Sequence, residues 1–169
     1  MNDLIERANK YARGAGRIQT GQYRAATTNE LLSTMLSWSS AALSAVVGTT
    51  IFAGLQKDSQ WVIPTGLAVL VAAALVAVER TSKLGERAVA HRLAGSEYGR
   101  LRRHADMLRL RLEGGDLTRT DGLAELDKIG DALSDLAKTS RALPDGIYER
   151  AKKSFDKEHP KYSRTAPSH

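Results

Sequence analysis

Two long segments without a charged residue, residues 31–56 and 59–78, dominate the hydrophobic pattern of this chain. A Lys-Asp pair alone separates them. A helix of about 20 apolar residues crosses the roughly 30 Å core of a bilayer, and both segments reach that length. The pattern therefore predicts a transmembrane hairpin with helices at residues 31–55 and 61–78. A water-soluble fold that buries both helices is the alternative, although such a fold rarely omits surface charge over so long a run.

Small polar residues recur along one face of the first predicted membrane helix. Their spacing of three or four residues keeps them on the same side of a helix. These residues are Ser33, Ser37, Ser40, Ser44 and Gly48. Such a face lets helices approach closely and hydrogen-bond across the contact, and it can instead line a water-filled pore. The sequence leaves both uses open, as a pore lining or as a helix-packing face.

The regions on both sides of the predicted hairpin have the periodicity of amphipathic helices. We expect one such helix at residues 3–29, and a cytoplasmic helix at residues 79–112 that continues the second membrane helix. Gly95 and Gly99 predict that the second of these crosses another helix closely. Along this helix, apolar and small residues follow the heptad spacing of a seam between helices. The seam comprises Leu84, His91, Tyr98, Leu101, Ala105, Leu108 and Leu112.

The end of the chain completes the predicted fold. Gly114 and Gly115 suit a helix C-terminus, where glycine readily adopts the left-handed backbone conformation. Further helices are expected within residues 120–156, and the composition of residues 157–169 predicts a disordered tail. The predicted fold class is thus an all-α membrane protein. Its cytoplasmic helical domain would consist of the N-terminal helix, the long extension of the second transmembrane helix and the C-terminal helices, in one domain over residues 1–156.

The net charge of +6 is unevenly distributed, with basic residues gathered at residues 79–112. Under the positive-inside rule, this distribution predicts that both termini lie in the cytoplasm. Nucleic-acid binding is a weaker interpretation, because basic residues beside membrane helices are expected from topology and from anionic headgroups alone. We therefore expect no specific nucleic-acid partner. Four arginines of this region form a candidate signal-binding basic face: Arg87, Arg92, Arg100 and Arg103.

No arrangement of residues typical of an enzyme is present in the sequence. The chain has no cysteine, which excludes disulfides, thiolate metal sites and cysteine nucleophiles. Its four histidines lack the spacing of metal ligands, and no glycine-rich phosphate loop follows a predicted strand. We therefore predict no catalytic residues, no metal site and no cofactor.

Two motifs beside the predicted hairpin resemble the SLATT family of bacterial conflict-system effectors. The first is ERAVAHRLAGSEYGRLRR at residues 86–103, and the second is ALPDGIYERAKKSF at residues 142–155. In that family, a basic helix with a tyrosine follows the second span, and a terminal helix begins at a proline. The two motifs resemble these two helices. The matching residues are Tyr98, Pro144, Tyr148 and Ala151. The resemblance covers about residues 5–156.

The resemblance implies a membrane effector of a bacterial antiphage system that forms a homo-oligomer and permeabilises the inner membrane. Its implied partners are the lipid bilayer, further copies of itself, and a sensor protein or cyclic nucleotide from a neighbouring gene. A non-conducting membrane adaptor, which recruits a cytosolic protein through the helical domain, is the alternative function. The residues by themselves do not indicate a nucleotide site.

Overall fold

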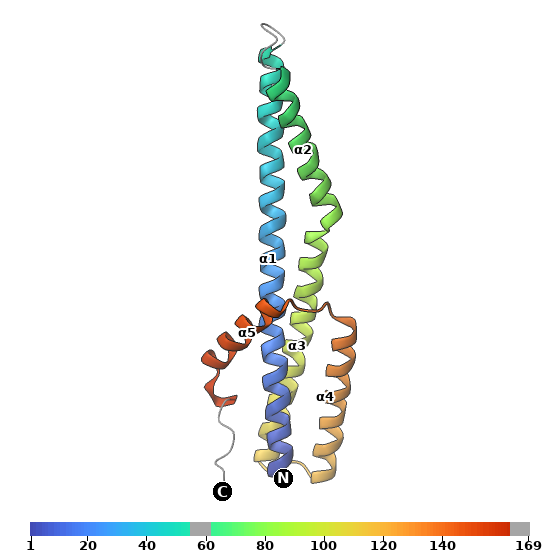
Figure 1. Ribbon diagram of the computed structural model, residues 1–169. Helices are drawn as coiled ribbons and strands as arrows, with labels where there is room; N and C mark the ends of the chain where they lie inside the picture. Colours follow the sequence, from blue (N-terminus) through green and yellow to red (C-terminus); the bar gives the residue numbers. More distant parts are fainter. Residues whose placement is uncertain (55–61, 163–169) are drawn as a thin grey trace. The chain divides into compact units, whose positions relative to one another are not determined.

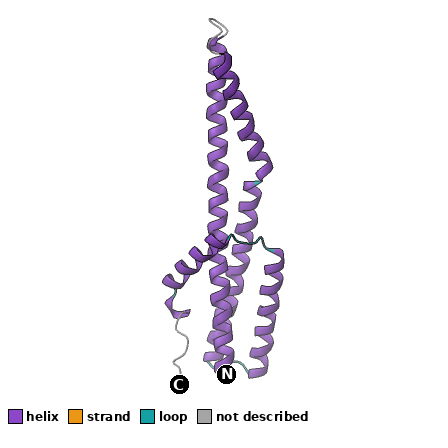
Figure 2. Ribbon diagram, in the orientation of Figure 1, coloured by secondary structure: helices purple, strands orange, loops and turns teal. Residues whose placement is uncertain are grey.

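The computed structural model describes residues 1–54 and 62–162, and the described residues are almost entirely helical (Figures 1 and 2). In chain order the elements are α1 (Asn2–Gly54), α2 (Val62–Ser82), α3 (Leu84–Glu113), α4 (Arg119–Thr139), α5 (Asp145–Glu158) and the short 3-10 helix η2 (Pro160–Tyr162). They form two compact units. The first unit is Met1–Ala26 with Val89–His169, and the second unit is Thr27–Ala88.

The core of the first unit joins side chains from every helix that contributes to it. Its buried residues are Leu4, Ala8 and Ala12 of α1, Ala105, Leu108 and Leu112 of α3, Leu126 and Ile129 of α4, Phe155 of α5, and Tyr162 of η2. The predicted seam of α3 is thus folded inward, because its members from His91 to Leu112 are all buried. Leu84 belongs to the second unit and is half-buried.

The predicted close crossing at Gly95 and Gly99 is confirmed. A Cβ atom built on Gly95 would lie 3.2 Å from the Tyr23 ring, and one built on Gly99 would lie 2.5 Å from Nε2 of Gln19. The two glycines therefore let Tyr23 and Gln19 of α1 pack closely against the backbone of α3. The helix then ends as expected near Gly115, whose φ of +75° is in the left-handed region.

The second unit is a helical hairpin formed by the C-terminal part of α1 and by α2. Two predicted boundaries differ from the structure here. The expected helices at residues 3–29 and 31–55 are one continuous helix, α1. The second predicted span does not continue smoothly into the next helix, because Lys83, with φ of 49°, interrupts the chain between α2 and α3.

The predicted transmembrane hairpin is wrong. Among the described residues, no helix combines the length and the apolarity that a membrane crossing requires. The prediction relied on the absence of charge over residues 31–56 and 59–78 of the sequence. Hydroxyl groups from Ser33 to Thr49 dilute the apolar character of α1, and the charge-free part of α2 runs only from Val62 to Val78. The membrane fold class, the inner-membrane location and the cytoplasmic placement of both termini are withdrawn with it.

The predicted disordered tail also needs a correction. Lys157 and Glu158 form the end of α5, and η2 follows with Tyr162 buried in the core. Helical structure thus extends at least to residue 162. Residues 163–169 and the predicted turn between the hairpin helices lie outside the described part of the chain.

Candidate interaction surfaces

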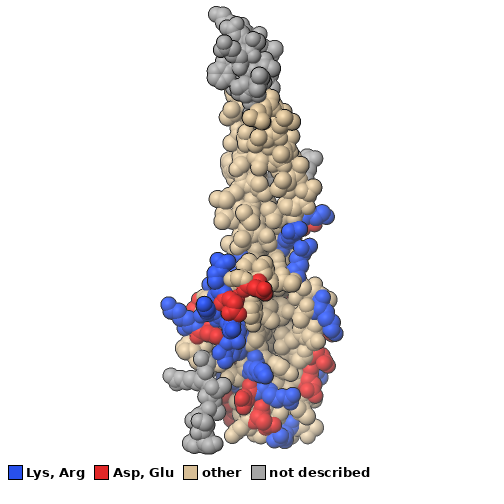
Figure 3. Space-filling view, viewed as in Figure 1, with Lys and Arg blue, Asp and Glu red and all other residues tan. Residues whose placement is uncertain are grey.

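The α1 side of the hairpin carries large apolar side chains on its outer face. Leu31, Met35, Trp38 and Val46 follow one another at helical spacing, and all are more than half exposed. Trp38 is 74% exposed, which is unusual for the largest apolar side chain in proteins. Figure 3 shows the described surface of this hairpin without Lys, Arg, Asp or Glu over most of its length.

The α2 side has a matching outer stripe. Leu67, Leu70, Val71 and Val78 lie on one face of the helix and are 45% to 68% exposed. The opposite face of α2 carries small residues, of which Ala72 is buried against α1. Each helix of the second unit is therefore apolar around most of its circumference, a pattern typical of a helix that is buried on all sides.

An open groove of about 630 Å³ lies between the two helices of the hairpin. Small side chains form most of its wall, so that another helix or a bulky side chain can approach the backbone closely. The lining residues are Ser44, Gly48, Val69, Ala72, Ala73, Val76 and Ala77. The groove thus carries mainly small side chains, whereas the outer stripes carry large ones.

The predicted serine face of α1 contributes to this groove. Ser40 is buried within the hairpin, Ser33 is half-buried, and Ser44 and Gly48 line the groove. Ser37 is exposed. Of the five positions, Ser40 is thus packed inside the hairpin, and the use of the others as a helix-packing face stays a prediction. The pore alternative depended on a transmembrane hairpin and falls with it.

A buried polar cluster fixes α1 to α3 in the first unit. Nδ1 of His91 lies 2.6 Å from Oε1 of Gln22, and because an amide oxygen only accepts, the imidazole donates this hydrogen bond. Nε2 of Gln22 in turn donates to the carbonyl oxygen of Arg141 at 3.1 Å. Burial holds the pKa of His91 below its ordinary value, and the charge of Arg141 acts in the same direction. His91 is thus a neutral structural residue, and the cluster resembles no catalytic arrangement.

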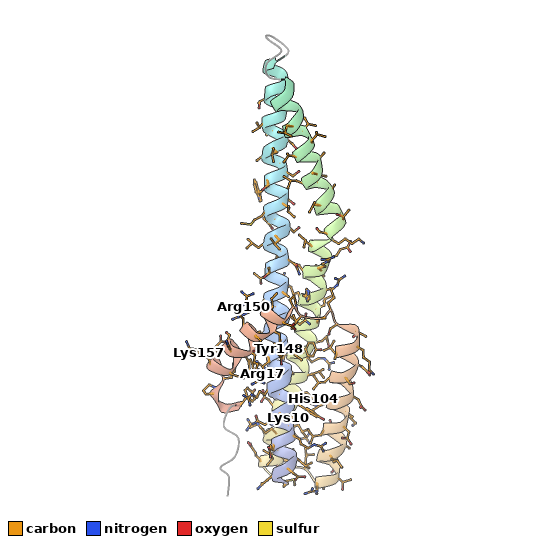
Figure 4. All side chains as sticks on the ribbon, in the orientation of Figure 1. Lys10, Arg17, His104, Tyr148, Arg150 and Lys157 are labelled. Atoms are coloured by element: carbon orange, nitrogen blue, oxygen red, sulfur yellow. The ribbon has the colours of Figure 1, made fainter. Side chains whose placement is uncertain are left out.

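A second polar cluster fastens α5 and η2 to the rest of the first unit. Arg13 and Arg17 of α1 both donate hydrogen bonds to the carboxylate of Asp156, with Nε of Arg17 at 3.0 Å from Oδ1. Figure 4 shows Arg17 at the level of α5. The hydroxyl of Tyr162 donates to Oδ2 of Asp106 at 2.6 Å. The arginine hydrogen bonds, that from Arg17 first, hold the pKa of Asp156 below its usual value. These contacts anchor the C-terminal helix and do not converge on an open site.

The four arginines of the predicted signal-binding face belong to two different units. Arg92, Arg100 and Arg103 are exposed on α3 in the first unit, whereas Arg87 belongs to the second unit. Nε of Arg100 already donates to Glu97 at 2.9 Å. The signal-binding face therefore stays a prediction.

The motif residues of the SLATT resemblance have structural roles. The hydroxyl of Tyr98 lies 3.3 Å from Oγ of Ser140, which links α3 to the end of α4. Pro144 precedes the first residue of α5, Ala151 is fully buried, and Tyr148 is half-buried. No group of His, Asp or Glu side chains suited to a metal ion occurs in the described part of the chain.

No protein-family model, curated protein or solved structure matches this chain. The resemblance to SLATT therefore rests on the motif residues and stays a prediction.

Proposed function

We propose that this protein is a self-assembling helical interaction protein, in which the hairpin of one copy packs against the hairpin of a second copy. The observation that carries the proposal is the exposed apolar surface of the second unit. Ten of its large apolar side chains are 42% to 74% exposed. Monomeric proteins in water rarely leave so large a contiguous apolar surface uncovered.

The chemistry of this surface matches what a stable interface needs. Full burial of a Leu, Val or Met side chain contributes about 1.5–3 kcal/mol relative to leaving it exposed. Burial of a few of the ten side chains in one contact therefore supplies substantial binding energy.

A second copy fits this surface better than a charged partner does. The hairpin has no charged residue between Glu30 and Gly54, so a charged partner would leave its own charges unpaired and desolvated. The same hairpin offers both a groove walled by small residues and stripes of bulky side chains that can fill it. Two copies thus contain both halves of a complementary contact, as a symmetric homo-oligomer requires.

The SLATT resemblance supports the assembly part of this proposal, because its members are expected to act as oligomers. A sensor protein or cyclic nucleotide that controls assembly is the corresponding partner in this proposal. The permeabilisation of a membrane that the resemblance implied depended on the predicted transmembrane hairpin and is not carried further.

Sedimentation velocity on the purified full chain in buffer without detergent tests the proposal. We expect a discrete homo-oligomer whose mass falls with dilution. Trp38→Glu and Leu70→Glu should each shift the distribution toward monomer, because a buried unpaired carboxylate costs several kcal/mol. Leu123→Glu is the matched control, since Leu123 is an exposed leucine of α4 in the first unit. Far-ultraviolet circular dichroism verifies that each variant remains helical.

Three results would overturn the proposal. The first is a wild-type chain that stays monomeric at all concentrations. The second is an oligomer that both glutamate variants leave intact. The third comes from flotation with phosphatidylcholine vesicles. If the wild-type chain leaves the aqueous oligomer to float with the vesicles, and Trp38→Glu abolishes this, the occupant of the apolar surface is lipid and not a second copy.

A further inference from the structure

A second heptad pattern runs along the outer face of α3, separate from its buried seam. We call it the outer seam, and its members are Val89, Leu93, Ser96, Arg100, Arg103, Met107 and Leu110. Their steps alternate between four and three residues, which is the spacing of a helix that packs along another helix. All of these residues belong to the first unit.

No described residue of the first unit covers the outer seam. Its four large apolar side chains, Val89, Leu93, Met107 and Leu110, are 53% to 64% exposed. The three polar members between them are exposed as well. The buried residues of α3, by contrast, face α1, α4 and α5 across the core. Over about 31 Å, at 1.5 Å per residue, one side of α3 therefore has coiled-coil spacing and no covering helix.

The order of side chains along the outer seam specifies the chemistry of its partner. Apolar pairs lie at the two ends, and Arg100 and Arg103 lie near the centre. Glu97 takes only the Nε hydrogen bond of Arg100. Arg103 makes no ion pair with any described residue. A partner that buries the apolar ends must also supply carboxylates at the centre, because a cation covered without a counter-charge is strongly unfavourable.

Neither a second outer seam nor the acidic face of α4 meets that requirement. If two outer seams packed together in either direction, their central arginines would face one another, and like charges across a helix contact are destabilising. The acidic outer face of α4, with Asp127 and Asp131, has Leu123 at one end but Lys138 at the other. It therefore cannot cover both apolar ends of the outer seam.

We propose that the outer seam is the docking site for an amphipathic helix of another protein, with apolar residues at both ends of its contact face and acidic residues at the centre. The apolar ends provide binding energy, and the central arginines select the partner and fix its register. This interface is independent of the hairpin contact proposed above, so the two proposals can fail separately.

Binding of two synthetic helices to the full chain tests this inference by fluorescence anisotropy. Both peptides are about 22 residues long, matching Val89–Leu110, and carry leucine at the outer heptad positions. One has glutamate at the central positions and the other has lysine. We expect the glutamate peptide to bind at least about tenfold more tightly, with the difference shrinking as salt screens the charges.

Charge reversal in the protein provides the decisive comparison. In the double variant Arg100→Glu with Arg103→Glu, the preference should invert, so that the lysine peptide binds more tightly. Lys153→Glu with Lys157→Glu on α5 is the control, because it changes the net charge equally at exposed residues outside the outer seam. That variant should keep the preference for the glutamate peptide.

Three outcomes would overturn the inference. The first is that neither peptide binds. The second is that both double variants prefer the same peptide. The third is that the Arg100 and Arg103 substitutions change the oligomer mass. The last would show that the outer seam contacts a second copy. Since all these positions are exposed, circular dichroism and a Met107→Ala variant separate loss of binding from loss of folding. Met107→Ala removes apolar contact without adding a charge, so it should weaken both peptides alike.

Discussion

Phe155 of α5 fills the space that a side chain on Gly16 of α1 would need. A Cβ atom on Gly16 would overlap Cε2 and Cζ of the ring and would lie 3.1 Å from Cδ of Arg102. The ring is 1% exposed, so it has little room to move aside in a close-packed core. The docking of α5 on α1 therefore depends on the absence of a side chain at this position.

This contact predicts opposite effects at two neighbouring glycines. Gly16→Ala should lower the free energy of unfolding by about 1–3 kcal/mol, because overpacking outweighs the gain in helix propensity. Gly14→Ala should raise it by up to about 1 kcal/mol, since a Cβ atom on Gly14 meets nothing within 4 Å. Urea unfolding followed by circular dichroism measures both. Equal effects of the two substitutions would contradict the contact with Phe155.

The paired arginines on Asp156 predict a loss of stability in acid. The folded chain holds the pKa of Asp156 below its ordinary value, chiefly through the hydrogen bond from Arg17. The stabilisation is therefore complete above the unfolded value of about 3.9 and is lost as pH falls toward the folded pKa. Asp156→Asn should cost about 1 kcal/mol at neutral pH and reduce the acid dependence of unfolding. Asp127→Asn, at an exposed aspartate of α4, is the control; if it reproduces the effect, the arginine contacts are not its source.

The buried imidazole of His91 also predicts that stability depends on pH. Here the cause is burial of a neutral side chain, whereas at Asp156 it is hydrogen bonding to a charged one. Burial holds its pKa below the unfolded value of about 6.5, so the unfolded chain binds more protons in the interval between the two values. The free energy of unfolding should therefore decrease as pH is lowered through this interval. His91→Gln should reduce this slope, and unfolding curves from about pH 8 to pH 5 would show it. His104→Gln, at an exposed histidine of the same helix, controls for the loss of an imidazole. A wild-type slope in His91→Gln would refute the assignment.

The interior of the first unit could be predicted from the sequence better than the second unit could. A seam between helices depends on local spacing, and the heptad positions of Leu101 and Leu108 are buried as expected. Gly95 and Gly99 could be recognised because a close helix crossing needs small residues. The continuity of α1 was missed because composition changes near residue 30, although no proline or glycine there interrupts the backbone.

The two polar clusters of the first unit could not have been predicted. Gln22 falls on the apolar stripe of α1, but nothing local indicates that it meets His91 and the carbonyl oxygen of Arg141. Arg17 and Asp156 are likewise far apart in sequence, and only the packing of α5 brings them together. The membrane prediction failed for a different reason, since it counted every charge-free residue of the sequence toward a span, whereas the charge-free part of α2 runs only from Val62 to Val78.

The two seams of α3 also bear on how this protein can change over evolutionary time. On one side of the helix, the packed core restricts which residues are tolerated. On the other side, the contact of the outer seam with its partner restricts them. Few positions on its circumference then remain where a substitution is neutral. Homologous chains should therefore diverge more slowly along α3 than along α4, whose outer face carries no such double constraint.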